Sequence, residues 1–301
     1  QVREAQIEAA LEKVRARTIG MQKSEELNKA ASDMFRQIQS LGMQPWACGF
    51  NIFDKDEKAV TQYMSLADGG ISPPFRTPLT EDPFFKNIYE ARKRRDELLV
   101  WESKGESLAA TYRYMFSLPG SREIFGDLKS SGFQMPKHQI THCAYFSQGY
   151  LVFITYDLIP EAYDIFKRFA KVFEQTYTRF LDLQKAEAQA REAQIEAALE
   201  RVRSRSMAMH KSDELHEAGE ILLVEIQKLG IESLTAGYVL MDKDKKNGLN
   251  YAPNPYTKKI LPLPVIIPHN ETIHMQQVFE NWKKGNSFFI VEMDEEEIVV
   301  V

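Results

Sequence analysis

The stretch REAQIEAALE at residues 3–12 recurs unchanged at residues 191–200. Around it, residues 3–27 and 191–215 are identical at 18 of 25 aligned positions, and most of the differences are conservative. Ala, Glu, Arg, Gln and Lys, which favour helix, dominate both copies, and no glycine or proline occurs in either before Gly20. Each copy is therefore predicted to form one helix.

The offset of 188 residues between the copies persists beyond this helix. It aligns IQSLGM at 38–43 with IQKLGI at 226–231, and GFNIFDKDEK at 49–58 with GYVLMDKDKK at 237–246. A repeat of this length indicates a duplicated domain rather than a duplicated helix. The second copy has no counterpart of roughly residues 112–180, so we expect the chain to be a fragment of a larger protein.

The repeat divides the chain into four parts. We predict a first helix, a complete domain, a second helix and a partial second domain, at residues 1–23, 24–185, 186–211 and 212–301. From Pro160 to about Leu229 there is no further proline and a single glycine, so a nearly continuous helix of about 70 residues is expected. Its first half has an apolar face that should cover a sheet, formed by Phe166, Phe169 and Phe173.

Both copies of the repeated helix carry side chains at the a and d positions of a heptad. These are Ile7, Leu11, Val14, Thr18 and Met21 in the first copy, and Ile195, Leu199, Val202, Ser206 and Met209 in the second. So narrow a stripe is typical of a helix that pairs with another helix, and we expect a parallel dimeric coiled coil. The alternative is a single helix packed on its own domain. The hydroxyl residues Thr18 and Ser206 should weaken the seam and let it switch.

Period-two alternation predicts two antiparallel hairpins in the first domain. WACGFNIFD at 46–54 and AVTQYMSLA at 59–67 flank a polar turn, and HQITHCAYFS at 138–147 and YLVFITYD at 150–157 flank Gly149. Helices are expected before, between and after them, at about 24–41, 81–95, 106–131 and from 160 onward. This order indicates an α+β fold with a central antiparallel sheet and helices on its faces.

The order of elements resembles the GAF fold of sensory domains, and the pattern E-AALE-VR-R in both helices resembles the signalling helices of bacterial sensor histidine kinases. The resemblance implies tandem GAF-like domains joined by coiled-coil signalling helices in a cytoplasmic homodimer. It also implies a domain that binds a small molecule or a partner, and a downstream output such as the kinase of a two-component system. The alternative function is a ligand-free dimerisation scaffold or spacer.

A ligand in the first domain would be expected among aromatic side chains of the sheet and its covering helices. The candidates are Trp46, Tyr63, Arg76, Trp101, Tyr112 and His142. Core packing is the alternative for the aromatic ones. The corresponding loop of the second copy, YAPNPYTKK at 251–259, has a different composition, so the two domains are not expected to bind the same molecule. The sequence does not identify a cofactor.

Composition argues against several classes of partner. The net charge of −5 lacks the basic excess of nucleic-acid-binding proteins, and no apolar run is long enough to span a membrane. His138, His142 and Cys143 offer too few convergent ligands for a metal or haem site. His210 and His216 have no histidine counterpart in the first copy, so we do not expect a phosphoacceptor. With no convergent catalytic motif, no enzyme is expected within this chain.

Overall fold

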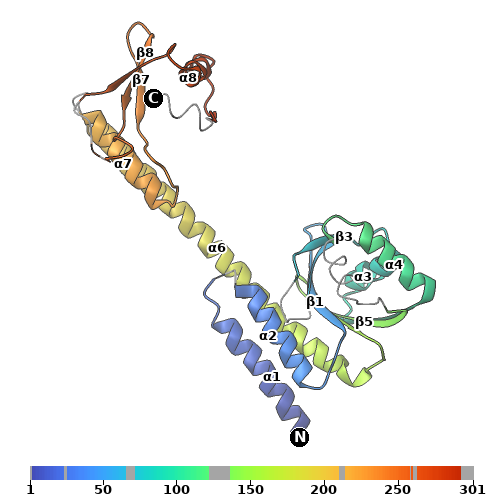
Figure 1. Ribbon diagram of the computed structural model, residues 1–301. Helices are drawn as coiled ribbons and strands as arrows, with labels where there is room; N and C mark the ends of the chain where they lie inside the picture. The colour runs from blue at the N-terminus through green and yellow to red at the C-terminus, as the bar shows by residue number, and fades with distance from the viewer. Residues whose placement is uncertain are drawn as a thin grey trace. The chain divides into compact units, whose positions relative to one another are not determined.

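The computed structural model of the chain has an α+β fold in two units, Gln1–Glu187 and Ala188–Val301. It describes residues 2–23, 26–65, 72–121, 136–209, 214–257, 259 and 263–292. This described part contains a six-stranded antiparallel sheet and seven α-helices, one of them long (Figure 1). The predicted fold class is confirmed at this level. Residues 122–135, predicted to be helical as far as about 131, lie outside the described residues.

The sheet of unit 1 has the strand order β3-β2-β1-β6-β5-β4. Its strands are β1 (Ala47–Phe53), β2 (Ala59–Met64), β3 (Phe75–Pro78), β4 (Leu98–Lys104), β5 (His138–Phe146) and β6 (Gly149–Thr155). Both predicted hairpins are present, and β1 pairs with β2 on one side and β6 on the other. At the start of β6 a side chain on Gly149 would overlap the carbonyl oxygen of Asn51, so this close approach requires glycine.

Helices cover both faces of this sheet (Figure 1). On one face lie α2 (Leu27–Ser40) and the first half of α6 (Tyr163–Met207), which follows a short 3-10 turn at Pro160–Ala162. On the other face lie α3 (Pro83–Arg94) and α4 (Gly105–Ser117). The buried Asp82 side chain caps α3 by accepting hydrogen bonds from the backbone nitrogens of Phe84 and Phe85, at 2.9 and 3.3 Å.

The first half of α6 packs on the sheet through aromatic side chains, as its sequence pattern predicts. Phe166, Phe169 and Phe173 are fully buried. The ring of Phe166 stacks on that of Phe153 with centroids 4.2 Å apart, and Phe173 lies 4.9 Å from Phe50. Burial of these rings stabilises the packing of α6 against the sheet.

The seam of the first helix is buried inside unit 1 rather than offered to a second chain. In α1 (Val2–Ile19) and just after it, the side chains of Ile7, Leu11, Val14, Thr18 and Met21 are all no more than 7% exposed. They face α2 and α6, and Thr18 shares a hydrogen bond with Thr176 of α6 at 2.5 Å. The structure therefore shows the packing of the first helix on its own domain, because α6 already supplies the complementary helix.

The predicted continuous helix from Pro160 to Leu229 is wrong. Helix α6 has 45 residues and ends at Met207, and α7 (Leu215–Lys228) follows as a separate helix. The reason is that α7 gains contacts by folding back along α6. Arg201 of α6 forms an ion pair with Glu225 of α7, and Arg191 donates to the carbonyl oxygen of Leu229 at 2.8 Å. His210 lies outside the described residues.

Unit 2 contains the second half of α6, α7, a three-stranded sheet and α8 (Ile273–Lys283). The strands, in the order β7-β8-β9, are β7 (Tyr238–Met241), β8 (Asn247–Tyr251) and β9 (Val265–Pro268). Helix α7 begins 188 residues after α2, and β8 begins 188 residues after β2. In the second copy of the seam, Leu199 is 49% exposed and Ile195, Val202, Ser206 and Met209 are half-buried.

Candidate functional site

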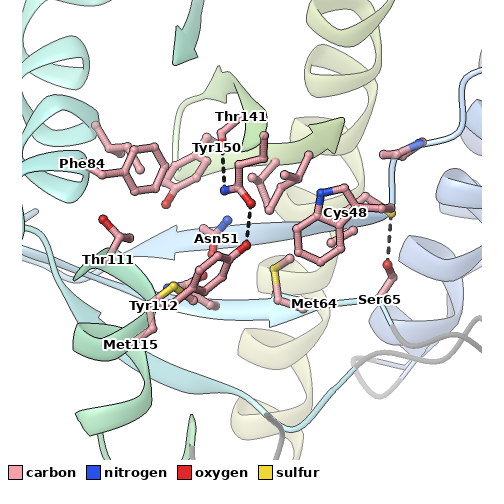
Figure 2. A pocket seen from close by; sticks show the side chains of 18 of the residues that line it. Cys48, Asn51, Met64, Ser65, Phe84, Thr111, Tyr112, Met115, Thr141 and Tyr150 are labelled. Carbon is pink, nitrogen blue, oxygen red and sulfur yellow. Dashed lines mark hydrogen bonds between the residues drawn. The ribbon is translucent and has the colours of Figure 1, made fainter. Parts of the chain in front are cut away.

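Unit 1 contains a cavity of about 290 Å³ between the sheet and helices α3 and α4. Strands β1, β2, β5 and β6 form its floor, and Figure 2 shows the side chains that surround it. The apolar part of its lining includes Phe75, Phe84, Phe85, Ile88, Leu108 and Met115. A cavity of this size exceeds by far the room that one water molecule needs and approaches the size of small-ligand pockets.

The roof of the cavity follows from the periodicity of its two helices. Leu108, Thr111, Tyr112 and Met115 recur every three or four residues on α4, so they share the face that looks onto the sheet. The Thr111 hydroxyl donates to the carboxylate of Asp82, the residue that caps α3, at 3.2 Å. This contact ties the two roof helices together.

No Lys, Arg, Asp, Glu or His occurs among the described residues that line the cavity. A phosphate or carboxylate placed there would lose its hydration without gaining a counter-charge, and burying an unpaired charge is costly. The lining therefore suits an uncharged molecule.

Polar side chains on neighbouring strands are mostly hydrogen-bonded to one another. The Tyr112 hydroxyl donates to Oε1 of Gln139 at 2.5 Å, and Nε2 of Gln139 donates to the Thr141 hydroxyl at 3.4 Å. Burial raises the pKa of Tyr112, so its hydroxyl stays protonated as a donor. On β2, Nε2 of Gln62 donates to the buried Thr77 hydroxyl at 2.5 Å.

Asn51 on β1 differs from these residues. Its side chain lines the cavity and is 1% exposed, yet neither its Nδ2 nor its Oδ1 atom has a hydrogen-bond partner in the described part of the chain. In the sheet it pairs with Gln62 on β2 and with Tyr150 on β6, and both of these residues also line the cavity. Buried polar groups are nearly always hydrogen-bonded, so an amide with two unmet atoms in a cavity is a candidate ligand contact.

Cys48 lies at one end of the cavity, and its side chain is a protonated thiol rather than a reactive thiolate. Its Sγ atom is 3.1 Å from the Ser65 hydroxyl oxygen, and the side chain is 3% exposed. Burial raises the pKa of the Cys48 thiol to about 11. The thiolate needed for covalent chemistry is therefore scarce at neutral pH.

Two of the six ligand residues predicted from the sequence line the cavity. Trp46 lies at its end beside Cys48, stacked on Tyr156 with centroids 6.4 Å apart, and Tyr112 belongs to its roof. Trp101 lies on the cavity face of β4, opposite Thr141, but at the edge of the sheet and outside the lining.

The other three predicted residues are elsewhere. Tyr63 stacks on Phe50 at 4.5 Å on the face that α6 covers. His142 is fully buried on that same face, between Thr155 and Phe166. Arg76 is exposed on β3 and pairs with Asp54 at 2.8 Å. Tyr63 and His142 are aromatic residues of the sheet, but successive strand residues point to opposite faces, and these two point to the face that α6 covers.

The amides that line the cavity do not stand out from the sequence pattern alone. Asn51, Gln62 and Gln139 lie on three different strands, β1, β2 and β5. One amide per strand, at positions of the same face, was the signal that could have identified them. To recognise that the three amides share a face, the register of the strands must be known as well as their sequence pattern. A shift of one residue moves a side chain to the other face of the sheet.

No group of three or more His, Cys, Asp or Glu side chains is arranged to hold a metal ion among the residues that the structure describes. Within the same residues, none of the helices is both long enough and apolar enough to cross a membrane.

Neither a protein-family profile nor a curated protein matches the sequence. One matching solved structure is a bacteriophytochrome from the photosynthetic bacterium R. palustris, with a TM-score of 0.39 and 10% identity. The match covers 94% of this chain and 54% of the bacteriophytochrome, so the chain spans about half of that protein's length. We draw neither fold nor function from a similarity at this level.

Proposed function

We propose that the chain is a sensory and signal-relay segment in which unit 1 binds a small uncharged molecule in its cavity. The observation that carries the proposal is the unpaired, buried amide of Asn51 within a lining that holds no charged side chain. A structural core would fill this volume, since protein interiors pack with few voids larger than a water molecule.

Strand β1 offers a short physical connection from the cavity to α6. Asn51 lines the cavity on one face, while its neighbour Phe50 points to the other face and contacts Phe173 of α6. A ligand that shifts β1 would therefore change the packing of α6, which leads into unit 2. Such a shift requires that the ligand bind the two packing states with different affinity.

The remaining parts of the proposal follow from the repeated helix. We propose that unit 2 is a second GAF-like domain, that the protein is a cytoplasmic homodimer, and that its output is a histidine kinase of a two-component system. The parallel helix contact is proposed for the second copy, because Leu199 is 49% exposed whereas Leu11 is 1% exposed. Light scattering tests this contact. A dimer that dissociates in Leu199→Asp supports it, and a monomer in both wild type and variant contradicts it.

Ligand uptake can be tested with N-phenylnaphthylamine, an uncharged probe that fluoresces in apolar surroundings. We expect the full chain to take up one molecule saturably. Met115→Trp fills the cavity from α4 and should abolish uptake, whereas Arg113→Trp, on an exposed position of the same helix, should not. Circular dichroism checks that both variants fold. Absent uptake, or equal uptake by both variants, would exclude this cavity as the binding site.

The relay can be tested in the same samples by amide hydrogen exchange. If binding changes the packing of α6, protection of residues 163–180 should change when the probe is added and should not change in Met115→Trp. Uptake without any change in the protection of α6 would indicate a domain that binds a ligand without changing the packing of α6. That result would contradict the relay part of the proposal. The alternative of a ligand-free spacer predicts no uptake at all.

A further inference from the structure

The amide of Asn51 differs from two other amides in the lining of the cavity. Gln62 and Gln139 each use their Nε2 donor within the protein, whereas both the donor and the acceptor of Asn51 are unpaired. Because Asn51 is 1% exposed, bulk water does not reach it as it reaches a surface amide. Its two groups must be satisfied from within the cavity.

A primary amide presents an N–H donor and a C=O acceptor side by side. The matching group is one in which an N–H and a C=O also lie side by side and point the same way, as in a lactam, an imide or a pyrimidinone. An open-chain secondary amide does not match, because its trans geometry directs the two groups to opposite sides. We propose that Asn51 binds a cyclic cis-amide edge of an uncharged ligand through two parallel hydrogen bonds. This inference rests on the proposed function, since it requires that the cavity bind a ligand.

The surroundings of Asn51 support an apolar body behind that edge. Phe84, Phe85, Ile88 and Met115 from the roof helices line the same cavity. A ligand without the cis-amide edge would leave the amide of Asn51 unsatisfied, so it should bind more weakly than a ligand that carries the edge. Discrimination thus comes from the penalty on the wrong ligand as much as from the bonds to the right one.

The second unit lacks this feature. The residue that lies 188 positions after Asn51 is Val239, on β7, and its side chain is 48% exposed. A valine offers neither donor nor acceptor. The cis-amide contact is therefore a property of unit 1, and the repeated helices connect units with different binding chemistry.

The experiment uses the full chain and three probes of similar size. Dihydroisoquinolinone is a cyclic cis-amide, its N-methyl derivative lacks the N–H donor, and tetralin lacks both polar groups. Their affinities are measured by displacement of N-phenylnaphthylamine. We expect the affinity of the lactam to be at least about ten-fold higher than that of its N-methyl derivative. This ratio corresponds to the loss of one well-formed hydrogen bond whose acceptor, the Asn51 oxygen, is left buried.

A variant of Asn51 identifies the contact. Asn51→Leu keeps the size of the side chain and removes both polar groups, so the preference for the lactam should vanish while tetralin binds at least as well as before. Asn250→Leu, a half-buried amide of unit 2, is the matched control and should bind as wild type does.

The outcomes separate the two proposals. Equal affinities of the wild type for all three probes would overturn the cis-amide contact and leave the cavity as a binding site. A lactam preference that survives in Asn51→Leu would also overturn the contact, because another group must then provide it. Failure of all three probes and of N-phenylnaphthylamine to bind would overturn both the contact and the proposed function.

Discussion

Leu11 and Leu199 occupy the same position of an identical ten-residue sequence, but Leu11 is 1% exposed and Leu199 is 49% exposed. Replacing either by alanine changes helix propensity equally. The difference between their effects on the free energy of unfolding therefore measures tertiary burial. Leu11→Ala leaves a cavity among α1, α2 and α6 and is expected to destabilise unit 1 by about 2–5 kcal/mol. Leu199→Ala loses about half of a leucine's burial and should destabilise unit 2 by less than about 1.5 kcal/mol.

The two units can be followed separately by tryptophan fluorescence. Trp46 and Trp101 report on unit 1, and Trp282 reports on unit 2. In a Trp282→Phe background only unit 1 contains tryptophan, so urea unfolding gives the effect of Leu11→Ala on the stability of unit 1. In a Trp46→Phe, Trp101→Phe background only unit 2 contains tryptophan, and urea unfolding gives the effect of Leu199→Ala on the stability of unit 2. A lower urea midpoint at constant slope identifies a loss of stability. If both substitutions cost the same, the assignment of different surroundings to the two copies is refuted.

Three further predictions concern buried polar groups. The hydroxyls of Thr18 and Thr176 satisfy each other, so Thr18→Val alone should destabilise unit 1 by about 1 kcal/mol, while the Thr18→Val, Thr176→Val pair should cost less than the sum of the single changes in a double-mutant cycle. Burial lowers the pKa of His142 from 6.5 to about 4. Between these values the unfolded chain binds a proton that the folded chain does not, so the stability of unit 1 should fall as the pH drops through this window, and His142→Gln should weaken that dependence in urea titrations at pH 7 and pH 5. Hydrogen bonds from Arg201 and then Lys228 lower the pKa of Glu225 from 4.5 to about 2. Unit 2 should therefore lose stability as the pH falls from about 4.5 towards 2, and a Glu225→Gln chain that unfolds with the same acid dependence would contradict this assignment.

Local patterns in the sequence predicted both hairpins of unit 1 and the buried face of α6. The alternation in residues 46–54 and 59–67 predicted β1 and β2, and Gly149 predicted the turn between β5 and β6. The spacing of Phe166, Phe169 and Phe173 predicted the buried face of α6. These features are set by contacts within a few residues or by side-chain period, both of which a single sequence displays.

The cavity required the tertiary structure. Its floor combines side chains from four strands that lie between residues 47 and 155, and its roof combines side chains from two helices. Tyr63 and His142 are as aromatic as Trp46 and Tyr112, but they lie on the opposite face of the sheet. Whether an aromatic residue packs in the core or lines a cavity depends on which element covers its face.

The repeated helix shows the division most clearly. By itself, the sequence REAQIEAALE determined that residues 3–12 and 191–200 are helical and carry one narrow apolar stripe. It could not determine that Leu11 is buried and Leu199 exposed, since the local sequence is the same in both places. That difference arises because the first half of α6, more than 150 residues away along the chain, folds back onto the first copy. Helix formation depends on neighbours in sequence, whereas burial depends on what the fold brings near in space.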